Sequence, residues 1–437
     1  MKDALVRTVA ASMQASIPDQ KSRIAVGLSG GIDSVVLLHL LRHGLRISPK
    51  RISAIHVNHQ ISAHAGAWAS QCRRYCRELG VRLKVAKVEI RRGNSTEAAA
   101  RDARYAVFAS GESEVIALAH NRDDQAETIL LQLLRGAGPR GLSGMPVYRS
   151  GIPSLWRPLL DTPRRAIEAY ARRHRLDWVE DDSNQDRSYL RNFVRHDVLP
   201  LVGTRVAGVS AVLARAARLQ AEASDLLDVL AEQDVGDAVA EGSIEVSALR
   251  RLPEHRARNA LRYFLRCNEV TMPESIRLEE ALRQACSARG DAQVCVDIGD
   301  VELRRFRDSL YIVRHLPPIK PSFEFSCRGT SDVQLPQLGG VLRFESCKGA
   351  GIAAGWMRKR LTVRVRLGGE VLRLESKGPG RTVRNLLQEA GLPPWKRARL
   401  PMLYLDDELV AVPGLGVDER FQPSARSQGW LPVWADE

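Results

Sequence analysis

A six-residue loop, Ser29-Gly30-Gly31-Ile32-Asp33-Ser34, separates two apolar runs near the start of the chain. The run before it, residues 24–28, predicts a buried strand, and the run after it, residues 35–41, predicts a helix. Two adjacent glycines let the chain turn tightly and bring its backbone close to a ligand. The first amides of a helix, at the positive end of its dipole, attract an anion. The loop therefore predicts a phosphate site, with Asp33 placed to hold a divalent cation.

Two other structures compete with a phosphate loop. Ser29 could cap an ordinary helix, but strand and helix flank the loop without a gap. A Walker loop is excluded, because the chain contains no Gly-x4-Gly-Lys-Ser/Thr.

A second glycine run, 136–141, fits the dinucleotide-binding pattern Gly-x-Gly-x2-Gly. We reject it as a dinucleotide site because it follows a helix rather than a strand, and because we expect Pro139 to interrupt any tight turn into a helix. We predict a flexible basic loop there, with Arg135 and Arg140 near the nucleotide edge.

Strands and helices alternate through the first third of the chain. This alternation predicts a parallel sheet with helices on both faces, in which ligands bind at the carboxyl ends of the strands. Loop 29–34 and the stretches 56–59 and 120–127 all fall at that edge. The expected strands are 24–28, 52–57, 82–88 and 115–120, and the expected helices are 33–43, 64–79, 96–109 and one from about 123.

After the region of alternating strands and helices, the sequence predicts two further domains. A long helix over 206–233 and helices near 247–266 and 273–288 predict a mainly helical middle domain, closed by β-like runs. Prolines at 317, 318 and 321 mark a linker, and a small α+β domain follows. We divide the chain into 1–204, 205–318 and 319–437. Within the last part we expect strands at 361–367 and 371–374, a helix at 382–390 and a hairpin at 403–412.

The net charge indicates the kind of binding partner, and the cysteine content indicates the redox state of the cellular compartment. The net charge of the 437 residues is +14, which favours a polyanionic partner such as nucleic acid, although a GC-rich genome also enriches arginine. Seven cysteines without a Cys-x2-Cys pair predict a reducing compartment. Cys72 and Cys76 share a helix face and fit packing better than a metal site. The chain has no apolar signal or membrane-spanning run, so we expect a cytoplasmic protein with no membrane partner.

Polar clusters elsewhere leave alternatives open. Helix 96–109 carries Glu97, Arg101 and Arg104 at helical spacing, which fits surface ion pairing as well as a site. Residues 181–195 combine Asp181-Asp182-Ser183-Asn184 with several arginines, which fits a loop returning to the site or a solvated linker. Asp124 and Glu127 lie one helical turn apart on the same face, close to the phosphate edge, which fits a site. Acidic residues near the start of a helix also stabilise it by interacting with the helix dipole, so a structural role fits equally well.

The loop 29–34 resembles the pyrophosphate loop of the N-type ATP pyrophosphatases, which adenylate a carbonyl oxygen with ATP. Further segments resemble the tRNA(Ile)-lysidine synthetase family within that superfamily, densely over 24–200 and clearly over 361–421. They are His120-Asn121-Arg122-Asp123-Asp124-Gln125-Ala126-Glu127-Thr128, Arg135-Gly136-Ala137-Gly138, Gly141-Leu142-Ser143-Gly144-Met145, Arg157-Pro158-Leu159-Leu160, Asp182-Ser183-Asn184 with Arg191-Asn192-x2-Arg195, Pro393-Pro394-Trp395, Arg399-Leu400-Pro401 and Asp418-Glu419-Arg420-Phe421. The segment 380–385 departs from the family by having fewer lysines, which leaves open how the C-terminal domain grips tRNA.

This resemblance implies an α/β fold, with an N-terminal Rossmann-like PP-loop domain, a mainly helical middle domain and a small α+β C-terminal domain. It implies a ligase that uses ATP and Mg²⁺ to adenylate the wobble cytidine of the CAU anticodon of an isoleucine tRNA. Free L-lysine then replaces AMP to form lysidine, which changes codon reading from AUG to AUA. A homodimer is compatible with this reading.

The resemblance also implies roles for individual residues. ATP would bind Ser29, Gly30, Gly31, Ile32, Asp33, Ser34 and His56, with Asp33 also the metal ligand. The catalytic residues would be Asp33, Arg101, Asp124 and Glu127. The tRNA or its adenylate would contact Arg135, Arg191, Asn192 and Arg195.

The lysine ammonium would bind Asp124 and Glu127, because it arrives as a cation and must then lose a proton. The rival assignment makes these two carboxylates magnesium ligands. Two other functions are alternatives to a ligase that adds lysine to tRNA. One is a thiolase that adenylates tRNA and would use sulfur in place of lysine, and the other is a catalytically silent tRNA-binding protein. The intact loop and acidic pair argue against the silent protein.

Overall fold

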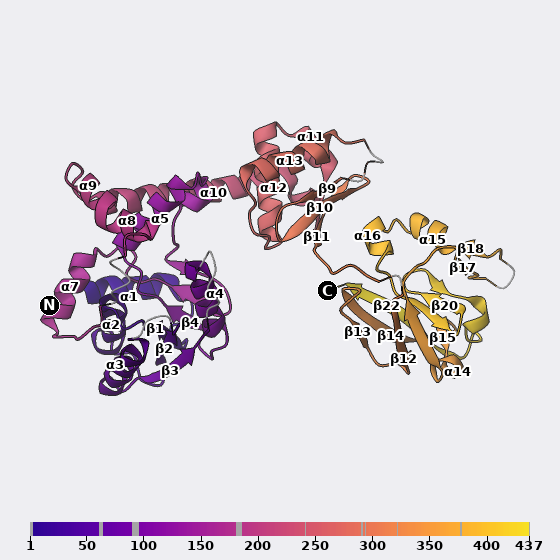
Figure 1. Cartoon of the computed structure of the whole chain (residues 1–437), viewed down its shortest axis with the longest axis horizontal. Helices are drawn as coiled ribbons and strands as arrows, with labels where there is room; N and C mark the ends of the chain where they lie inside the picture. The colour runs from indigo at the N-terminus through magenta and orange to yellow at the C-terminus, as the bar shows by residue number, and fades with distance from the viewer. Residues whose placement is uncertain are drawn as a thin grey trace. The chain divides into compact units, whose positions relative to one another are not determined.

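The computed structural model describes residues 3–60, 64–89, 96–180, 186–240, 242–289, 292, 294–320, 322–375 and 378–436. The chain forms two compact units, 1–229 and 230–437, with separate hydrophobic cores. Among the described residues, none of the helices has the length and apolar character to cross a membrane. Figure 1 shows a sheet wrapped by helices in the first unit and helices followed by β-rich structure in the second.

A six-stranded sheet organises the first unit. All neighbouring strands pair in parallel except the edge strand β5, which is antiparallel to β6. The predicted parallel sheet is confirmed, and β1 lies at its centre. In spatial order the strands are β3 (Arg82–Lys87), β2 (Ile52–Asn58), β1 (Ile24–Gly27), β4 (Val115–Ala117), β6 (Ser154–Trp156) and β5 (Tyr148–Arg149).

The side chains of β1 alternate between two cores because successive strand residues point to opposite faces of a sheet. Ile24 and Val26 join the larger core on one face, and Ala25 joins the smaller core on the other. Both faces are therefore buried, which explains why the strand is continuously apolar. Helices α1 (Ala4–Ser16), α2 (Ile32–His39), α3 (Ala65–Glu78) and α7 (Arg164–Arg173) cover the first face, and α4 (Thr96–Ala109) covers the second.

Three details of the first unit differ from expectation. Strand β4 ends at Ala117, and the residues up to His120 lead instead to α5 (Arg122–Leu134). The helix expected over 33–43 is α2 followed by a π-helical turn, Leu40–Gly44. The prediction that Pro139 prevents a helix is wrong: Pro139 is the first residue of α6 (Pro139–Leu142), where its missing N–H costs nothing.

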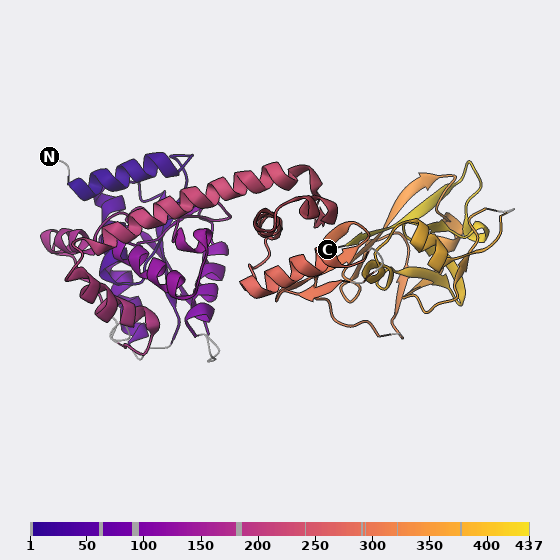
Figure 2. The same ribbon diagram turned by 90° about the horizontal axis from the view of Figure 1, so that it is seen from above.

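A long helix, α10 (Val209–Val235), links the first unit to the second (Figure 2). The expected helix 247–266 is two helices, α11 (Val246–Arg251) and α12 (Glu254–Cys267), because Pro253 ends one and caps the next. With α13 (Ser275–Ser287) they pack on a five-stranded sheet. Its order is β7 (Val239–Ala240), β8 (Ser243–Glu245), β11 (Ser309–Arg314), β10 (Val301–Phe306) and β9 (Cys295–Asp297).

The C-terminal part of the second unit is α+β, as expected. The predicted hairpin is β19 (Met402–Leu405) and β20 (Glu408–Val412), and the predicted helix is α15 (Val383–Glu389), followed by α16 (Pro394–Arg397). One sheet has the order β12 (Glu324–Arg328), β16 (Arg360–Arg364), β19, β20 and β21 (Gly416–Val417). The other has the order β13 (Val333–Leu335), β14 (Gly340–Lys348), β22 (Gln428–Asp436) and β15 (Ile352–Ala353). The predicted fold class is confirmed.

The second unit should depend on Phe264, which is fully buried in the core of α11–α13. We expect Phe264→Ala to cost about 3–5 kcal/mol of unfolding free energy, since it removes buried area and leaves a cavity. Phe325→Ala, in the same unit but 40% exposed, is the control and should cost much less. Urea unfolding measures both, and equal losses would contradict this packing.

Candidate active site

The loop between β1 and α2 is shaped by its own hydroxyl groups. Ser34 Oγ donates to the Gly31 carbonyl (2.9 Å) and lies 3.1 Å from Ser29 Oγ. The amides of Gly30 and Gly31 donate to Ser34 Oγ and Ser29 Oγ, both at 3.3 Å. These bonds fix the loop as a rigid cradle at the N-terminus of α2, where helix amides favour an anion.

Gly30 is required by both its backbone and its surroundings. Its φ of +96° lies in the region that favours glycine, and a Cβ there would be 3.3 Å from Cys72 Sγ. Cys72 and Cys76 are both buried, and burial raises the pKa of Cys72 to about 11. A neutral, enclosed thiol fits the packing role expected from the sequence.

A cavity of about 480 Å³ opens on one side of the loop. Its walls are the loop, the end of β2, α4 through Arg104 and Phe108, and the segment after β4. His56 is buried and its Nδ1 donates to the Leu28 carbonyl (2.8 Å). The cavity therefore combines apolar walls with a phosphate-type loop, the composition expected of a nucleotide site.

Two further histidines line this cavity, and sequence reasoning did not choose them as site residues. Burial lowers the pKa of His59, and it lowers the pKa of His120 to about 4, so both rings are neutral near pH 7. Their Nδ1 atoms are buried and have no hydrogen-bond partner in the described part of the chain. Both histidines line the cavity, and a buried polar atom without a partner is uncommon in proteins, which makes these two rings candidate ligand contacts. Their positions after β2 and β4 were the available sequence signal.

A second cavity, of about 730 Å³, shares Ser29, Gly31 and Asp33 with the first. Its walls are charged, unlike those of the first. They include Asn121, Asp123, Asp124, Glu127, Arg164 and Arg195. The loop thus borders both a nucleotide-sized cavity and a charged cavity.

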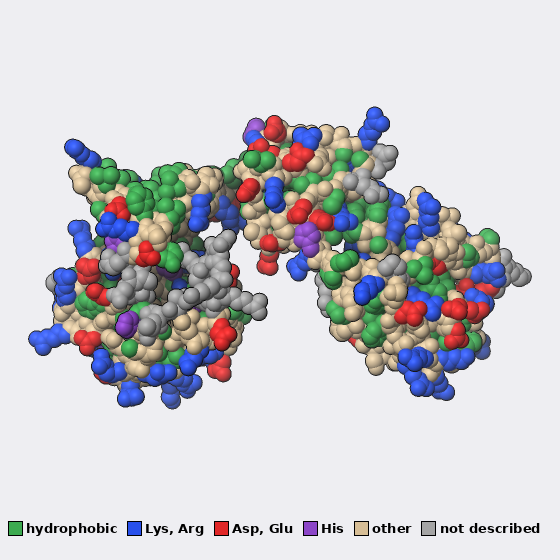
Figure 3. Space-filling model, viewed as in Figure 1, with side chains coloured by type: hydrophobic (Ala, Val, Ile, Leu, Met, Phe, Trp, Pro, Cys, Tyr) green, Lys and Arg blue, Asp and Glu red, His purple; other side chains and the backbone are tan. Residues whose placement is uncertain are grey.

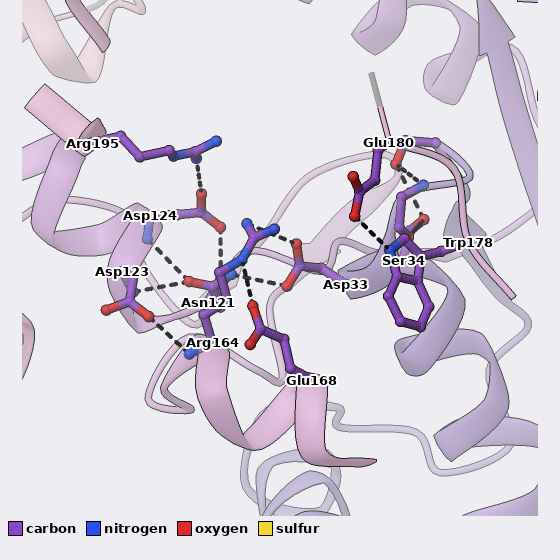
Figure 4. Close-up of polar contacts among 12 residues, drawn as sticks. Asp33, Ser34, Asn121, Asp123, Asp124, Arg164, Glu168, Trp178, Glu180 and Arg195 are labelled. Atoms are coloured by element: carbon purple, nitrogen blue, oxygen red, sulfur yellow. Dashed lines mark hydrogen bonds and ion pairs between the residues drawn. The ribbon is translucent and has the colours of Figure 1, made fainter. Parts of the chain in front are cut away.

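Asp33 lines both cavities. Figure 4 shows its carboxylate beside the side chains of Asn121 and Arg164. Asn121 Nδ2 donates to Asp33 Oδ1 (3.0 Å), and Arg164 Nη1 lies 3.8 Å from Oδ2. Burial, together with the nearby carboxylate of Asp124, raises the pKa of Asp33 to about 6, against the opposing effect of Arg164. The carboxylate is therefore held in an environment that lacks enough positive charge.

Asn121 was not chosen from the sequence, yet it organises the start of α5. Its Oδ1 accepts from the amides of Asp123 (2.9 Å) and Asp124 (3.1 Å), while Asp124 Oδ2 accepts from the Asn121 amide (3.0 Å). This capping box sets the direction of α5. Asp123 Oδ2 in turn accepts from the Arg164 amide (2.8 Å) at the start of α7. The available signal was an asparagine just before an acidic helix start.

Asp124 and Glu127 meet Arg191 and Arg195 in a four-residue charge cluster. Arg195 donates to both oxygens of Glu127 (2.6 and 3.0 Å) and to Asp124 (3.1 Å). Arg191 donates to Glu127 (2.8 Å) and Asp124 (3.4 Å). The Glu127 side chain is only 2% exposed. The sequence placed these residues in one site but did not predict that the arginines would neutralise the acidic pair.

The other predicted site residues lie apart from this cluster. The Arg101 guanidinium stacks on Tyr105, and it is Arg104 that lines the first cavity. Asn192 donates to the Asp186 carbonyl (2.8 Å) and so shapes the segment that carries the arginines. Arg135 is exposed at the end of α5. The stretch Asp181–Asn184 lies outside the described residues.

A strand–loop–helix phosphate cradle at the edge of a parallel sheet defines the N-terminal region as a PP-loop domain, and residues 3–202 match the PP-loop domain family. Residues 245–311 match the TilS substrate binding domain and residues 361–434 the TilS substrate C-terminal domain.

Curated relatives match nearly the whole chain. The tRNA(Ile)-lysidine synthase of Nitrosomonas europaea is 40% identical over 94% of this chain and 92% of the relative. That of Chromobacterium violaceum is 41% identical over 95% of this chain and 97% of the relative. The chain belongs to the tRNA(Ile)-lysidine synthase family of ATP-dependent ligases, which confirms the resemblance found in the sequence.

The raised pKa of Asp33 predicts how the free energy of unfolding depends on pH. Its carboxylate ionises less readily in the folded than in the unfolded protein, so ionisation destabilises the fold as pH rises from about 3.8 to about 6. Asp33→Asn should therefore stabilise the ligand-free protein at pH 7, by up to about 3 kcal/mol. The gain should shrink below pH 6 and vanish below pH 4.

Chemical denaturation across this pH range measures the effect. The control is Asp161→Asn, which removes an exposed carboxylate paired with Arg218 and should change stability little at any pH. A loss of stability at pH 7 in Asp33→Asn would contradict the raised pKa.

Proposed function

We propose that this chain modifies an isoleucine tRNA with lysine in two steps that share the loop 29–34. The observation that carries the proposal is that Asp33 and its loop border both cavities. One cavity has the size and lining of a nucleotide site, and the other has the charge needed for an amine and an RNA segment. A single reacting phosphate on the loop can then be reached from both.

In the first step, the carbonyl oxygen of the wobble cytidine in the CAU anticodon attacks the α-phosphorus of ATP. An oxygen–phosphorus bond forms to the base, and the bond to pyrophosphate breaks. ATP would lie in the 480 Å³ cavity with its phosphates on Ser29–Ser34 and its nucleoside toward His56, His59 and His120. Arg164 lies beside Asp33 and is placed to face the leaving pyrophosphate.

In the second step, the side-chain amine of lysine attacks the activated ring carbon. A carbon–nitrogen bond forms, the carbon–oxygen bond breaks, and AMP leaves with the oxygen. The amine must first give up a proton, since its ordinary pKa is about 10.4. We assign Asp124 and Glu127 to bind the ammonium group and one of these carboxylates to accept its proton. Lysine would share the two carboxylates with Arg191 and Arg195 or displace one guanidinium.

A magnesium ion fits the carboxylate of Asp33. Among the described residues, no group of three or more His, Cys, Asp or Glu side chains could hold a metal by itself. Mg²⁺ is commonly held by one or two carboxylates together with substrate phosphates, which is what Asp33 and ATP would offer. When bound, the ion would neutralise charge on the phosphates.

The remaining assignments stay predictions. They are the division into 1–204, 205–318 and 319–437, the roles of Arg101, Arg135 and Asn192, a homodimer and a cytoplasmic location. Separate cores in the middle and C-terminal segments support the boundary near 318. The first compact unit extends to residue 229, past the boundary predicted at 204.

Incubation with ATP, labelled lysine and an isoleucine tRNA transcript tests the proposal. We expect ATP-dependent label in the tRNA, and none when the wobble cytidine is replaced by uridine. Labelled sulfur entering the tRNA in place of lysine would point to a thiolase. tRNA binding with no incorporation of either label would point to a binding protein.

Glu127→Gln separates the two steps. It removes the charge that would hold the lysine ammonium, and losing such a charge-assisted hydrogen bond costs about 1.5–3 kcal/mol, or roughly ten- to a hundredfold. We expect a higher lysine KM or a lower kcat, while ATP and tRNA still form the adenylate. Glu112→Gln removes an exposed carboxylate that pairs with Arg23 outside both cavities, and it should leave both steps unchanged.

Loss of one partner from a buried ion pair can also unfold a protein. Thermal melting of Glu127→Gln shows whether the variant is still folded. Asp124→Asn, assayed in parallel, removes the other carboxylate of the pair and tests the same role. A Glu127→Gln protein that forms no adenylate until magnesium is raised would instead make these carboxylates metal ligands.

A further inference from the structure

A basic cleft of about 440 Å³ lies in the second unit, far along the chain from the PP-loop. One wall is β10 with its following turn, and the other is α15 and α16. Its described lining includes Trp395, Phe306 and five arginines: Arg304, Arg305, Arg307, Arg384 and Arg397. Figure 3 shows Lys and Arg side chains gathered over the region of α15 and α16.

Trp395 is held in place at this cleft by other aromatic rings. Phe306 and Tyr311 meet it edge-on, with ring centroids 6.3 and 5.6 Å away. The Arg304 guanidinium lies 5.7 Å from the centre of the indole. The indole is therefore fixed in position beside a cation while part of its surface stays exposed.

Arg304 is paired with Glu302 (2.6 Å), but three other arginines of the cleft are not matched by carboxylates. In the described part of the second unit, Arg307, Arg384 and Arg397 form no ion pair, and no Asp or Glu lines the cleft. Within the described residues, Arg307 donates to the backbone carbonyl of Gln388 and Arg397 to that of Leu392. Burial lowers the pKa of Arg397, and Arg366 and Arg307 lower it further. Such a cluster is stabilised by an anion.

The two walls contact each other directly. Phe306 on the first wall packs against Trp395 on the second, with ring centroids 6.3 Å apart. Arg307 on the first wall donates to the Gln388 carbonyl on the second (3.4 Å). Contacts within the chain therefore hold the two walls of the cleft against each other.

We propose that this cleft binds one unpaired nucleotide of the tRNA, with its base against Trp395 and its phosphates on Arg307, Arg384 and Arg397. The proposal rests on the proposed function for its choice of RNA. Aromatic stacking with flanking arginines is how proteins bind single-stranded nucleic acid. The volume suits a single small ligand. A paired base is buried in its helix and cannot enter such a cleft, so duplex RNA would bind here only through its phosphates.

Four variants of the full chain test the cleft. Trp395→Ala removes the stacking surface, and Trp395→Phe keeps an aromatic ring. Arg384→Gln removes one exposed cation and leaves the aromatic packing intact, which guards against misfolding of the tryptophan variant. Arg426→Gln is the matched control, because Arg426 is exposed and does not line the cleft.

The measurements are tRNA Kd at fixed salt and the kcat and KM of lysine incorporation. We expect Trp395→Ala to weaken tRNA binding roughly five- to a hundredfold, Arg384→Gln to weaken it less, and Trp395→Phe and Arg426→Gln to change it little. KM for tRNA should rise while kcat at saturating tRNA stays near that of the unmodified protein. An unpaired oligoadenylate should compete with tRNA better than a blunt RNA duplex does.

Three results would overturn the proposal. Unchanged tRNA affinity in both Trp395→Ala and Arg384→Gln would remove tRNA from the cleft. Equal competition by the blunt duplex would make it a phosphate surface. Binding of free AMP that the cleft variants abolish, without any change in tRNA affinity, would make it a mononucleotide site. A failure of the proposed function differs from all three, because the unmodified protein would then incorporate no lysine.

Discussion

The hydrogen bond from Asn121 to Asp33 is the contact on which the catalytic unit depends. The Asn121 side chain is buried, and its amide group serves two elements at once. Its oxygen caps α5, and its nitrogen holds the carboxylate of the phosphate loop. The loop after β1 and the helix after β4 are thereby fixed relative to each other. A catalytic constellation needs such rigid support.

Charge balance around this bond explains the chemistry that the site can perform. Three carboxylates, Asp33, Asp124 and Glu127, face the guanidinium groups of Arg164, Arg191 and Arg195. Burial, together with the nearby carboxylate of Asp124, raises the pKa of Asp33, and Arg164 offsets this only in part. The acidic pair on α5 is instead tied to two arginines. A cation arriving beside Asp33 would relieve that imbalance, and an anion arriving near the arginines would loosen their hold on α5.

The sequence predicted what depends on local pattern. Unbroken apolar runs gave the strands, and two glycines between a strand and a helix gave the loop, which Gly30 with its φ of +96° bears out. What it could not predict depends on segments that meet only in the fold. Arg191 and Arg195 follow Glu127 by more than sixty residues, so spacing alone could not pair them with it. Trp395 similarly meets Phe306 across a linker. The error at Pro139 had a local cause, because proline is tolerated at the first position of a helix.

The two-step mechanism requires that the tRNA base is activated before lysine reacts, and one measurement tests that order directly. The protein is incubated with tRNA and ATP labelled on the α-phosphate, without lysine, and the tRNA is recovered. We predict labelled AMP attached to the tRNA, lost when lysine is added. Label on lysine in place of tRNA, or no label on tRNA until lysine is present, would contradict the two-step mechanism.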